Sequence, residues 1–224
     1  MDRLPRTPEP ELMDSDEQAA AYSEGDFAGP HQAFVDEAVR RFGELATGTG
    51  RLLDLGCGPA DVTVRLARGC PGWTVTGIDG AEAMLRRGRA RVTAAGLADR
   101  VRLERLLLPS PALLARRFDA VASNSLLHHL ADPATLWEVV AGCLPPGAPV
   151  VVMDLRRPAD PDQVDAFVTR YAGDEPAVLR DDFRNSLVAA YRPDEVAGQL
   201  AGAGLGHLAV EPVGDRHLLV SGRR

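Results

Sequence analysis

Two glycines that stand one residue apart mark the first candidate site in this chain. Gly56 and Gly58 follow a short apolar run, and Asp54 stands two residues before the first of them. Because glycine has no side chain, such a turn lets the backbone pass close to a ligand. Asp79 ends a second apolar run, where its carboxylate can accept hydrogen bonds from both hydroxyls of a ribose. The pattern predicts a nucleotide-binding turn.

The elements that position this turn alternate between strands and helices. Short apolar runs predict strands over 51–56, 73–79, 101–106, 118–125 and 148–155. Amphipathic segments between them predict helices over 60–69, 81–96 and 132–144. This alternation predicts a parallel sheet that helices cover on both faces. Ligands of such sheets bind at the carboxyl ends of the strands, near the topological switch point.

Both ends of the chain depart from this rhythm. Near the beginning, two short helices over 16–27 and 29–42 are expected to be separated at a Gly-Pro pair, residues 29–30. Near the end, residues 207–222 predict two strands joined by a tight Val-Gly-Asp turn, so the sheet should have an antiparallel edge strand. Asp61 is the expected N-cap of the helix that follows the glycine turn.

Composition narrows the function classes. The formal charge is −7 and all 25 basic residues are arginine, which excludes a lysine Schiff base or a P-loop lysine. The acidic balance argues against nucleic-acid binding, and no apolar run approaches the roughly 20 residues that span a bilayer. The first residues do not resemble a signal peptide, so a cytoplasmic location is expected. No carboxylate or thiol cluster flanks His128 and His129 at metal-ligand spacing, and no metal site is expected.

Two nucleotide cofactors are compatible with the glycine turn, NAD and S-adenosylmethionine (SAM). An NAD fingerprint has a third glycine where this chain has Asp61, whose carboxylate would repel a pyrophosphate. Asp54 suits the cationic methionine end of SAM. The closing hairpin is also not expected of an NAD domain. The residues therefore favour SAM.

Four segments, taken in order, resemble class I SAM-dependent methyltransferases. "DLGCGPA" and "VTGIDGAEAML" are similar to the first two motifs of that family. "FDAVASNSLLHHLADP" and "APVVVMDLRRP" are similar to the segments at its fourth and fifth strands. The resemblance spans about residues 30–222. It implies a three-layer α/β/α sandwich around a seven-stranded, mostly parallel sheet in the order 3-2-1-4-5-7-6, with strand seven antiparallel.

The resemblance also implies roles in the cofactor site. The backbone of residues 56–58 would follow the methionine part of SAM, Asp79 would hold the ribose, and Tyr22 would reach the SAM carboxylate. Many relatives carry an aspartate after strand three that bonds the adenine; this chain has leucines there, so backbone groups are expected to hold the adenine edge. The expected cofactor contacts are Asp54, Gly56, Cys57, Gly58, Asp79, Gly80, Met84, Leu106, Leu107, Asn124 and Tyr22.

The acceptor side leaves more alternatives open. At most one of His128 and His129 is expected to face a substrate, where it could serve as a general base; the alternative is a capping or packing role. Arg156 is a candidate clamp for an acidic substrate group, or else a solvated residue at a strand end. His31 is a further substrate candidate. Tyr171 would line an apolar acceptor site or pack on the sheet.

The remaining segments complete the expected domain organisation. Residues 1–14, rich in proline and acids, are expected to be a flexible tail, and residues 15–224 a single methyltransferase domain. Within this domain, residues 15–48 would form a helical lid and residues 158–190 a helical insert that forms part of the acceptor site. His217, in the final hairpin, is expected to be structural and far from the pocket.

The expected function is transfer of the SAM methyl group to a small, natural-product- or metabolite-like acceptor by in-line displacement, leaving S-adenosyl-L-homocysteine (SAH). A protein or peptide acceptor is one alternative, and a non-catalytic SAM-binding module is another. The expected partner is the small-molecule acceptor, without nucleic acid or membrane, and the protein is expected to be a monomer or a homodimer.

Overall fold

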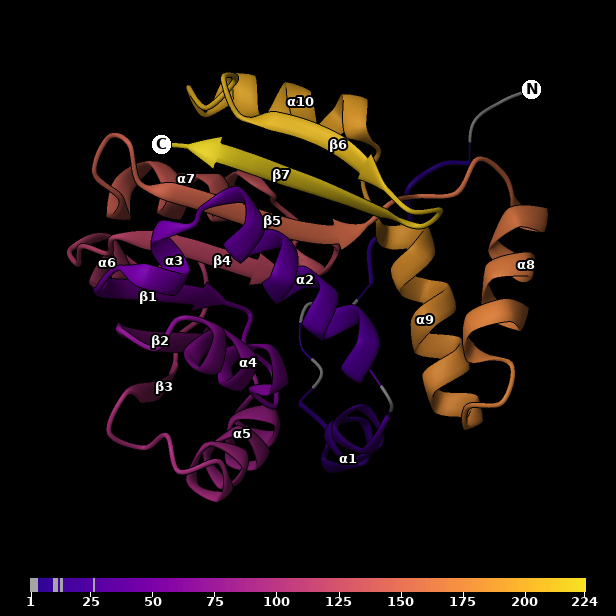
Figure 1. The fold of residues 1–224 in the computed structure, drawn as a ribbon. Coiled ribbons are helices and arrows are strands. Elements are labelled where there is room, and N and C mark those ends of the chain that lie inside the picture. Colours follow the sequence, from indigo (N-terminus) through magenta and orange to yellow (C-terminus); the bar gives the residue numbers. More distant parts are fainter. Residues whose placement is uncertain (1–3, 10–11, 13, 26) are drawn as a thin grey trace.

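A computed structural model describes residues 4–9, 12, 14–25 and 27–224 of the chain. Helices lie on both sides of one central sheet (Figure 1). The strands are β1 (Gly50–Leu55), β2 (Trp73–Asp79), β3 (Val101–Arg105), β4 (Ala120–Asn124), β5 (Pro149–Leu155), β6 (Ala209–Val213) and β7 (His217–Arg223). The helices are α1 (Asp16–Glu24), α2 (Ala28–Arg41), α3 (Glu44–Thr47), α4 (Asp61–Gly69), α5 (Glu82–Ala94), α6 (Pro111–Leu114), α7 (Ala134–Cys143), α8 (Pro161–Ala172), α9 (Ala177–Ala189) and α10 (Pro193–Gly202), with a 3₁₀ turn η1 (Leu127–His129) after β4.

The sheet has the strand order β3-β2-β1-β4-β5-β7-β6. β7 pairs antiparallel with both β5 and β6, whereas the pairs among β1 to β5 are parallel. The predicted fold class, strand order and antiparallel strand are therefore confirmed. Every residue of β5 is buried, as expected for a central strand that is covered on both faces.

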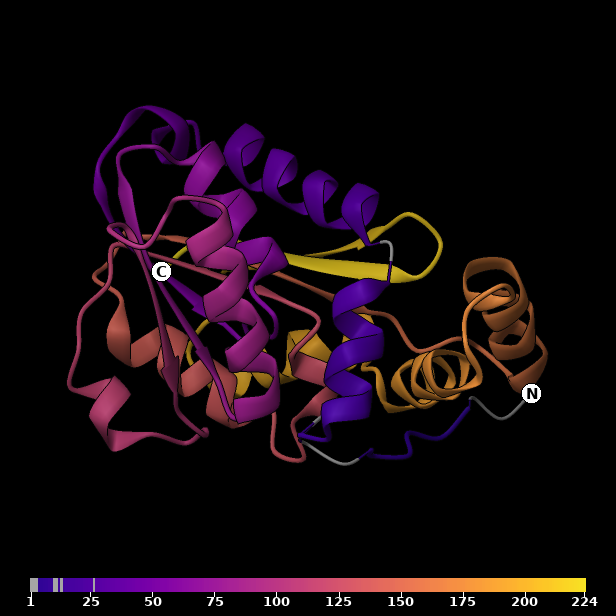
Figure 2. The ribbon, with the colours of Figure 1, turned by 90° about the horizontal axis from the view of Figure 1, so that it is seen from below.

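Two hydrophobic clusters hold the helices to the sheet. On one face, Trp137 of α7 is fully buried in the cluster that contains Leu53 of β1. On the other face, Phe34 of α2 and Leu66 of α4 belong to the cluster of Val75 of β2. Figures 1 and 2 show these helices on opposite sides of the strands. Burial on both faces fixes the strand ends, and with them the loops that form the site.

The break between the first two helices differs from the prediction. α1 ends at Glu24, and Gly25 caps it through a backbone N–H that bonds Ala21 O at 3.0 Å. α2 already begins at Ala28, so Pro30 lies in its first turn. A proline is tolerated there because the first N–H groups of a helix have no intrahelical partner. The Gly-Pro pair therefore starts a helix and does not divide two.

The predicted N-cap of α4 is also wrong. Ala60, in the left-handed conformation with φ of 62°, caps the helix, and Asp61 is its first helical residue. The Asp61 side chain pairs with His31 and Arg65. Its carboxylate thus links α2, through His31, to α4.

The segment expected to be a helical insert forms the helix pair α8–α9, which packs against itself beside the carboxyl ends of the strands (Figure 1). α1 contacts both α5 and α9, and Figure 2 shows it between them. The three helices α1, α5 and α9 enclose the space above the glycine turn. Among the described residues, no helix is long and apolar enough to cross a membrane.

Residues 4–9, expected to belong to a flexible tail, lie against the domain. Leu4 N donates to Ala159 O at 3.0 Å and Thr7 N to Val188 O at 3.3 Å. The Arg6 guanidinium lies 4.1 Å from the centre of the Tyr191 ring. These contacts hold residues 4–9 against the domain, whereas their proline and acidic composition suggested a flexible tail. Residues 1–3, 10–11 and 13 of that segment lie outside the described residues.

Candidate active site

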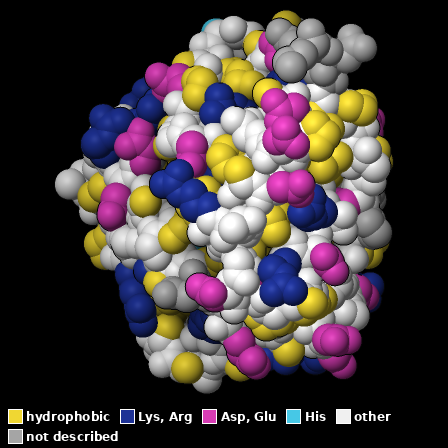
Figure 3. Space-filling view, turned by 90° about the vertical axis from the view of Figure 1, so that its right-hand side faces the viewer, with side chains coloured by type: hydrophobic (Ala, Val, Ile, Leu, Met, Phe, Trp, Pro, Cys, Tyr) yellow, Lys and Arg dark blue, Asp and Glu magenta, His cyan; other side chains and the backbone are white. Residues whose placement is uncertain are grey.

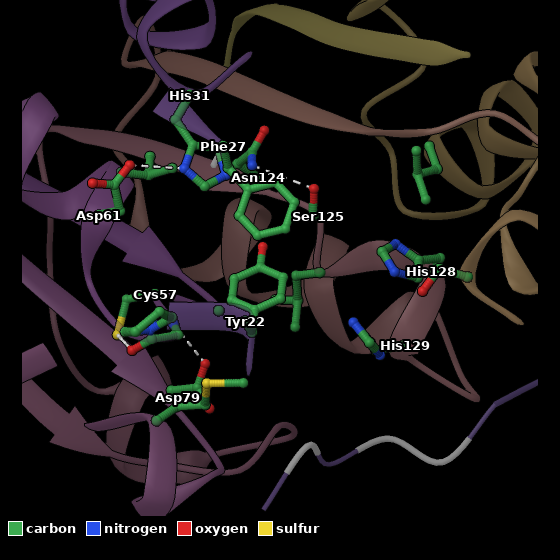
Figure 4. Close-up of a pocket in the computed structure, with 18 of the residues that line it drawn as sticks. Tyr22, Phe27, His31, Cys57, Asp61, Asp79, Asn124, Ser125, His128 and His129 are labelled. Carbon is green, nitrogen blue, oxygen red and sulfur yellow. Dashed lines mark hydrogen bonds and ion pairs between the residues drawn. The ribbon is translucent and has the colours of Figure 1, made fainter. Parts of the chain in front are cut away.

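One cavity of about 680 Å³ lies at the carboxyl ends of the strands, where the glycine turn was predicted to bind a ligand. Its floor is the β1–α4 turn and the end of β2, and η1 and the end of β5 form the far wall. α1, α2 and α9 complete the enclosure. Figure 4 shows the two halves, with Cys57 and Asp79 on one side and His128 and His129 on the other.

The β1–α4 turn needs its two glycines for different reasons. Gly56 has φ of 70°, and a Cβ there would lie 2.8 Å from Leu126 Cβ. Gly58 has φ of 50°, but a Cβ there would meet no protein atom within 4 Å. The backbone N–H groups of Gly56 and Cys57 both donate to Ile78 O at 2.9 Å, which fixes the turn on β2. The surface at Gly58 is thus left open to the cavity.

Asp79 is fixed at the end of β2 by backbone groups. Its Oδ2 accepts from Gly58 N and its Oδ1 from Ala81 N, both at 2.8 Å. Burial raises the pKa of Asp79 despite these bonds. Each carboxylate oxygen keeps a lone pair for a further donor, so the side chain can still accept from a diol in the cavity.

Asp54 lies deeper, with 1% of its surface exposed. The Thr63 hydroxyl donates to Asp54 Oδ2 at 2.6 Å. Burial, helped by the nearby Asp79 and opposed by the hydrogen bond from Thr63, raises the pKa of Asp54 to about 7. A cation in the cavity would favour the ionised form of this carboxyl.

An apolar slot lies beside Asp79. It is lined by Gly80, Met84, Leu106 and Leu107. Leu107 is 54% exposed, and a Cβ on Gly80 would lie only 2.5 Å from its Cδ2. The slot therefore depends on Gly80 having no side chain, and it offers flat apolar surfaces of the kind that hold an aromatic base.

The N-terminal helices place two stacked rings in the centre of the cavity. Tyr22 and Phe27 have ring centroids 4.8 Å apart, and Figure 4 shows them between the Asp79 side and the histidine side. Burial raises the pKa of Tyr22 to about 12, so its hydroxyl stays neutral. His31, a predicted substrate residue, lines the cavity but pairs its Nδ1 with Asp61 Oδ2 at 2.8 Å. It contributes to the attachment of the lid.

The far wall carries both predicted catalytic histidines. His128 Nδ1 lies 2.5 Å from Asp154 Oδ1, and both side chains are almost fully buried. Burial alone would lower the pKa of His128, but Asp154 and Glu9 outweigh it and the pKa is raised. The rings of His128 and His129 lie 4.2 Å apart, so both line the same wall rather than pointing in different directions.

A carboxylate that the sequence analysis did not identify lies beside these histidines. Glu9 Oε1 lies 3.1 Å from His129 Nδ1 and 3.5 Å from His128 Nε2. The sequence beside the histidine pair holds no carboxylate or thiol cluster, but the fold brings Glu9 to the pair. No local signal could have found Glu9, because it lies more than a hundred residues away in the chain.

The basic residue that lines the acceptor half is not the predicted one, Arg156. Arg156 does not line the cavity; its guanidinium donates to Asp215 O at 2.8 Å. Arg216, from the β6–β7 turn, takes that place and lies 3.5 Å from the centre of the Tyr171 ring. Tyr171 lines the cavity as predicted, and its hydroxyl donates to Asp215 Oδ2.

The last hairpin returns toward the cavity. His217 was expected far from the pocket, yet it lines it, and burial lowers its pKa to about 4. Leu179 and Phe183 of α9 add apolar surface to the same half, while Asn124 and Ser125 lie at the end of β4 between the two halves. Asn124 Nδ2 donates to Ser125 Oγ at 3.3 Å.

Comparison with known proteins agrees with this arrangement. Residues 53–150 match the model of a family described as a methyltransferase domain. The chain is 33% identical over 159 residues to a ubiquinone biosynthesis O-methyltransferase of Xylella fastidiosa, covering 69% of this chain and 60% of that protein.

The chain contains a class I methyltransferase domain.

Solved structures show how far the fold of this methyltransferase domain extends. A SAM-dependent methyltransferase from Aquifex aeolicus superposes with a TM-score of 0.64 at 17% identity, covering 93% of this chain and 98% of that one. The plantazolicin methyltransferase in complex with SAH superposes with a TM-score of 0.71 at 13% identity, covering 95% and 93%. Nearly the whole chain therefore adopts the fold. Among the first curated relatives, the matched segments span 24% to 60% of the relatives' own length.

Proposed function

We propose that the protein is a methyltransferase that transfers the methyl group of SAM to a small-molecule acceptor. The observation that supports this most is the continuity of the cavity. It joins the glycine turn and Asp79 at one end to the wall of His128 and Tyr171 at the other. A donor bound at the first end and an acceptor at the second would meet near Asn124.

The residues of the first half fit SAM. The open surface at Gly58 can receive the methionine part, the free lone pairs of Asp79 can accept from the ribose hydroxyls, and the buried carboxyl of Asp54 suits a nearby cation. The proposed adenine slot is lined by Gly80, Met84, Leu106 and Leu107. The proposed contacts of the methionine end are the Cys57 backbone, the Asn124 carbonyl and Tyr22.

The chain's own residues then have three tasks. SAM, when bound, supplies a methyl group on a sulfonium that is already a good leaving group. The walls of the cavity must align the acceptor's nucleophile in line with the methyl–sulfur bond and exclude water. The acceptor proton must leave as the new bond forms, and His128 and His129 lie on the wall where it would be received.

The enclosure favours a small acceptor over a protein. α1 and α2 cover the cofactor half and α9 closes the acceptor half, whereas a protein substrate needs an open groove. The face that includes α8 and α9 shows acidic and basic side chains intermixed (Figure 3), without a single charge sign that would attract a polymer. The named O-methyltransferase relative supports an oxygen nucleophile as the first class to test.

The test is a panel of hydroxylated aromatic and aliphatic acceptors incubated with the protein and SAM carrying a deuterated methyl group. The proposal predicts that at least one small acceptor gains the labelled methyl while SAH accumulates. Transfer to basic peptides alone would favour the protein-substrate alternative. SAM binding without transfer to any acceptor would favour a non-catalytic binding module.

A further inference from the structure

Three potential metal ligands converge where His128 and His129 line the acceptor wall of the cavity. Glu9 Oε1 lies 3.1 Å from His129 Nδ1 and 3.5 Å from His128 Nε2. The three ligand atoms all lie within 4.8 Å of one another. Atoms that share one zinc ion, each about 2.0–2.2 Å from it, are separated by about 3 to 3.5 Å. Both measured separations from Glu9 match this spacing.

We propose that Glu9, His128 and His129 bind one divalent transition-metal ion. Two imidazoles and one carboxylate form a donor set that suits Zn²⁺ and its first-row neighbours, whereas Mg²⁺ and Ca²⁺ prefer oxygen ligands throughout. Both histidines line the cavity, so the remaining coordination positions would face it. Nothing in the local sequence around the histidines supplies the third ligand; the N-terminal segment does.

The side chains behind the ligands are arranged as metal sites require. Asp154 Oδ1 contacts His128 Nδ1, which leaves Nε2 directed toward Glu9. Asp154 is itself fixed, because its oxygens accept from the backbone N–H groups of Leu127 at 2.6 Å and Leu155 at 2.7 Å. A carboxylate that holds the second nitrogen of a ligating histidine is the usual support of such sites.

Glu9 has its own support. The Ser186 hydroxyl of α9 donates to its carboxylate, at 3.2 Å from Oε1 and 3.4 Å from Oε2. The Glu9 side chain is only 10% exposed. Its carboxylate is therefore held toward the histidines by an interaction that does not depend on them.

The N-terminal segment is tied to the same turn that presents the histidines. The Arg6 guanidinium donates to His128 O at 3.0 Å, to Leu130 O at 3.2 Å and to Ala189 O at 2.6 Å. Because Arg6 is three residues before Glu9, these bonds set the distance between Glu9 and η1. The carboxyl groups of Glu9 and Asp154 thus lie on either side of the imidazole of His128, an arrangement that suits a bound dication.

The location of the site suggests a catalytic role for the ion, and this role rests on the proposed function. The two histidine ligands stand on the acceptor half, opposite Cys57 of the glycine turn (Figure 4). A bound dication there would contact an acceptor oxygen and favour its ionised form, which makes it a better nucleophile for the methyl group. In that case the acceptor proton is released to solvent before methyl transfer, and neither histidine needs to take it.

The test is metal binding in the absence of SAM and acceptor. Metal-free protein without a histidine tag is titrated with Zn²⁺ by calorimetry, and with Co²⁺ by visible absorption. We expect one equivalent to bind. Glu9→Gln and His129→Ala should each weaken binding about ten-fold or more. The matched surface variants Glu17→Gln and His207→Ala should bind as the wild type does.

Two results of the titrations would overturn the proposal, and a third comes from spectroscopy. One is the lack of saturable one-to-one binding to the wild type; the other is binding that Glu9→Gln and His129→Ala leave unchanged. Zinc-edge X-ray absorption of the wild type gives a readout that needs no variant: a shell without imidazole nitrogens contradicts the site. Because no methyl transfer is measured, failure of the proposed methyltransferase activity would leave this result unaffected.

Discussion

The two halves of the cavity are built in opposite ways. The glycine turn and Asp79, the central part of the cofactor half, come from two short stretches, residues 54–63 and 79–84, and the polar contacts that fix them are largely backbone groups set by the sheet. The acceptor half gathers the N-terminal segment, η1, α9 and the β6–β7 turn, and its contacts are between side chains. A local motif can therefore predict the first half, whereas the second exists only after the chain has folded.

Because the two halves are built differently, substitutions in each half should have different effects. The glycine turn sits on β1 and β2, in the middle of a sheet with a continuous core on both faces. The acceptor half stands on helices and loops outside the strands. Changes in the first half should abolish binding of the donor, and changes in the second should alter acceptor use while donor binding persists.

The largest effect is expected from Asp79→Ala. The ribose hydroxyls would lose a charged acceptor, and Gly58 N and Ala81 N would lose the partner that fixes the turn. Affinity for SAM should fall about 100-fold, or about 3 kcal/mol. Calorimetric titration measures this, with exposed Asp99→Ala as the control. Affinity within a factor of two of the wild type would contradict the proposed role of Asp79.

The two glycines of the turn should respond differently to alanine. Gly56→Ala places a methyl group 2.8 Å from Leu126 Cβ, so it should destabilise the fold by about 2 kcal/mol. Gly58→Ala meets no protein atom, so it should cost only about 1 kcal/mol from its left-handed backbone but weaken SAM about ten-fold. Thermal unfolding and titration separate the two effects; equal behaviour of both variants would contradict the open surface at Gly58.

SAM binding should depend on pH through Asp54. Burial raises the pKa of this carboxyl to about 7, whereas an unfolded chain loses the proton near pH 4. The contribution of Asp54 to the stability of the free protein is therefore present below pH 4 and is lost as the pH rises from about 4 through 7. A cationic ligand favours the carboxylate, so affinity for SAM should rise about five-fold between pH 6 and pH 7.

Titration at pH 6 in two buffers with different heats of ionisation measures this linkage directly. We expect a proton to be released on binding to the wild type, and Asp54→Asn to remove the release and flatten the pH dependence. Binding without proton release at pH 6 would show that SAM does not act on the ionisation of Asp54.

The smallest effect is expected in the acceptor half. Phe183 lines the cavity from α9, so Phe183→Ala should raise the KM of the acceptor about three-fold while the Kd for SAM stays unchanged. Phe167→Ala is the matched control, because Phe167 belongs to the same pair of helices but does not line the cavity. Equal loss of SAM affinity and acceptor affinity would show that the two halves are not separable.

The sequence predicted the strands and the cofactor half because both depend on local chemistry. β2 is the run of 73–79 without change, and β5 is buried at each residue because its run is apolar apart from Asp154. The glycine turn and Asp79 are recognisable for the same reason. The position of a residue at the end of a strand follows once the strand itself is known.

The acceptor half was predicted poorly because its contacts join distant segments. Arg156 follows β5, but the antiparallel β7 brings the β6–β7 turn over the cavity, and Arg216 takes the expected place. The same turn brings His217 to the cavity wall. Glu9 lies beside the histidines because Arg6 bonds the carbonyls of His128 and Leu130 and Ser186 bonds the Glu9 carboxylate.

The most direct test of the central claim is a calorimetric titration of the wild-type protein with SAM, with SAH and with NAD. The account predicts saturable one-to-one binding of SAM and SAH and none of NAD, because Asp61 stands where a pyrophosphate would lie. No binding of SAM, or binding of NAD in its place, would contradict the assignment of the glycine turn and Asp79 to a methyl donor.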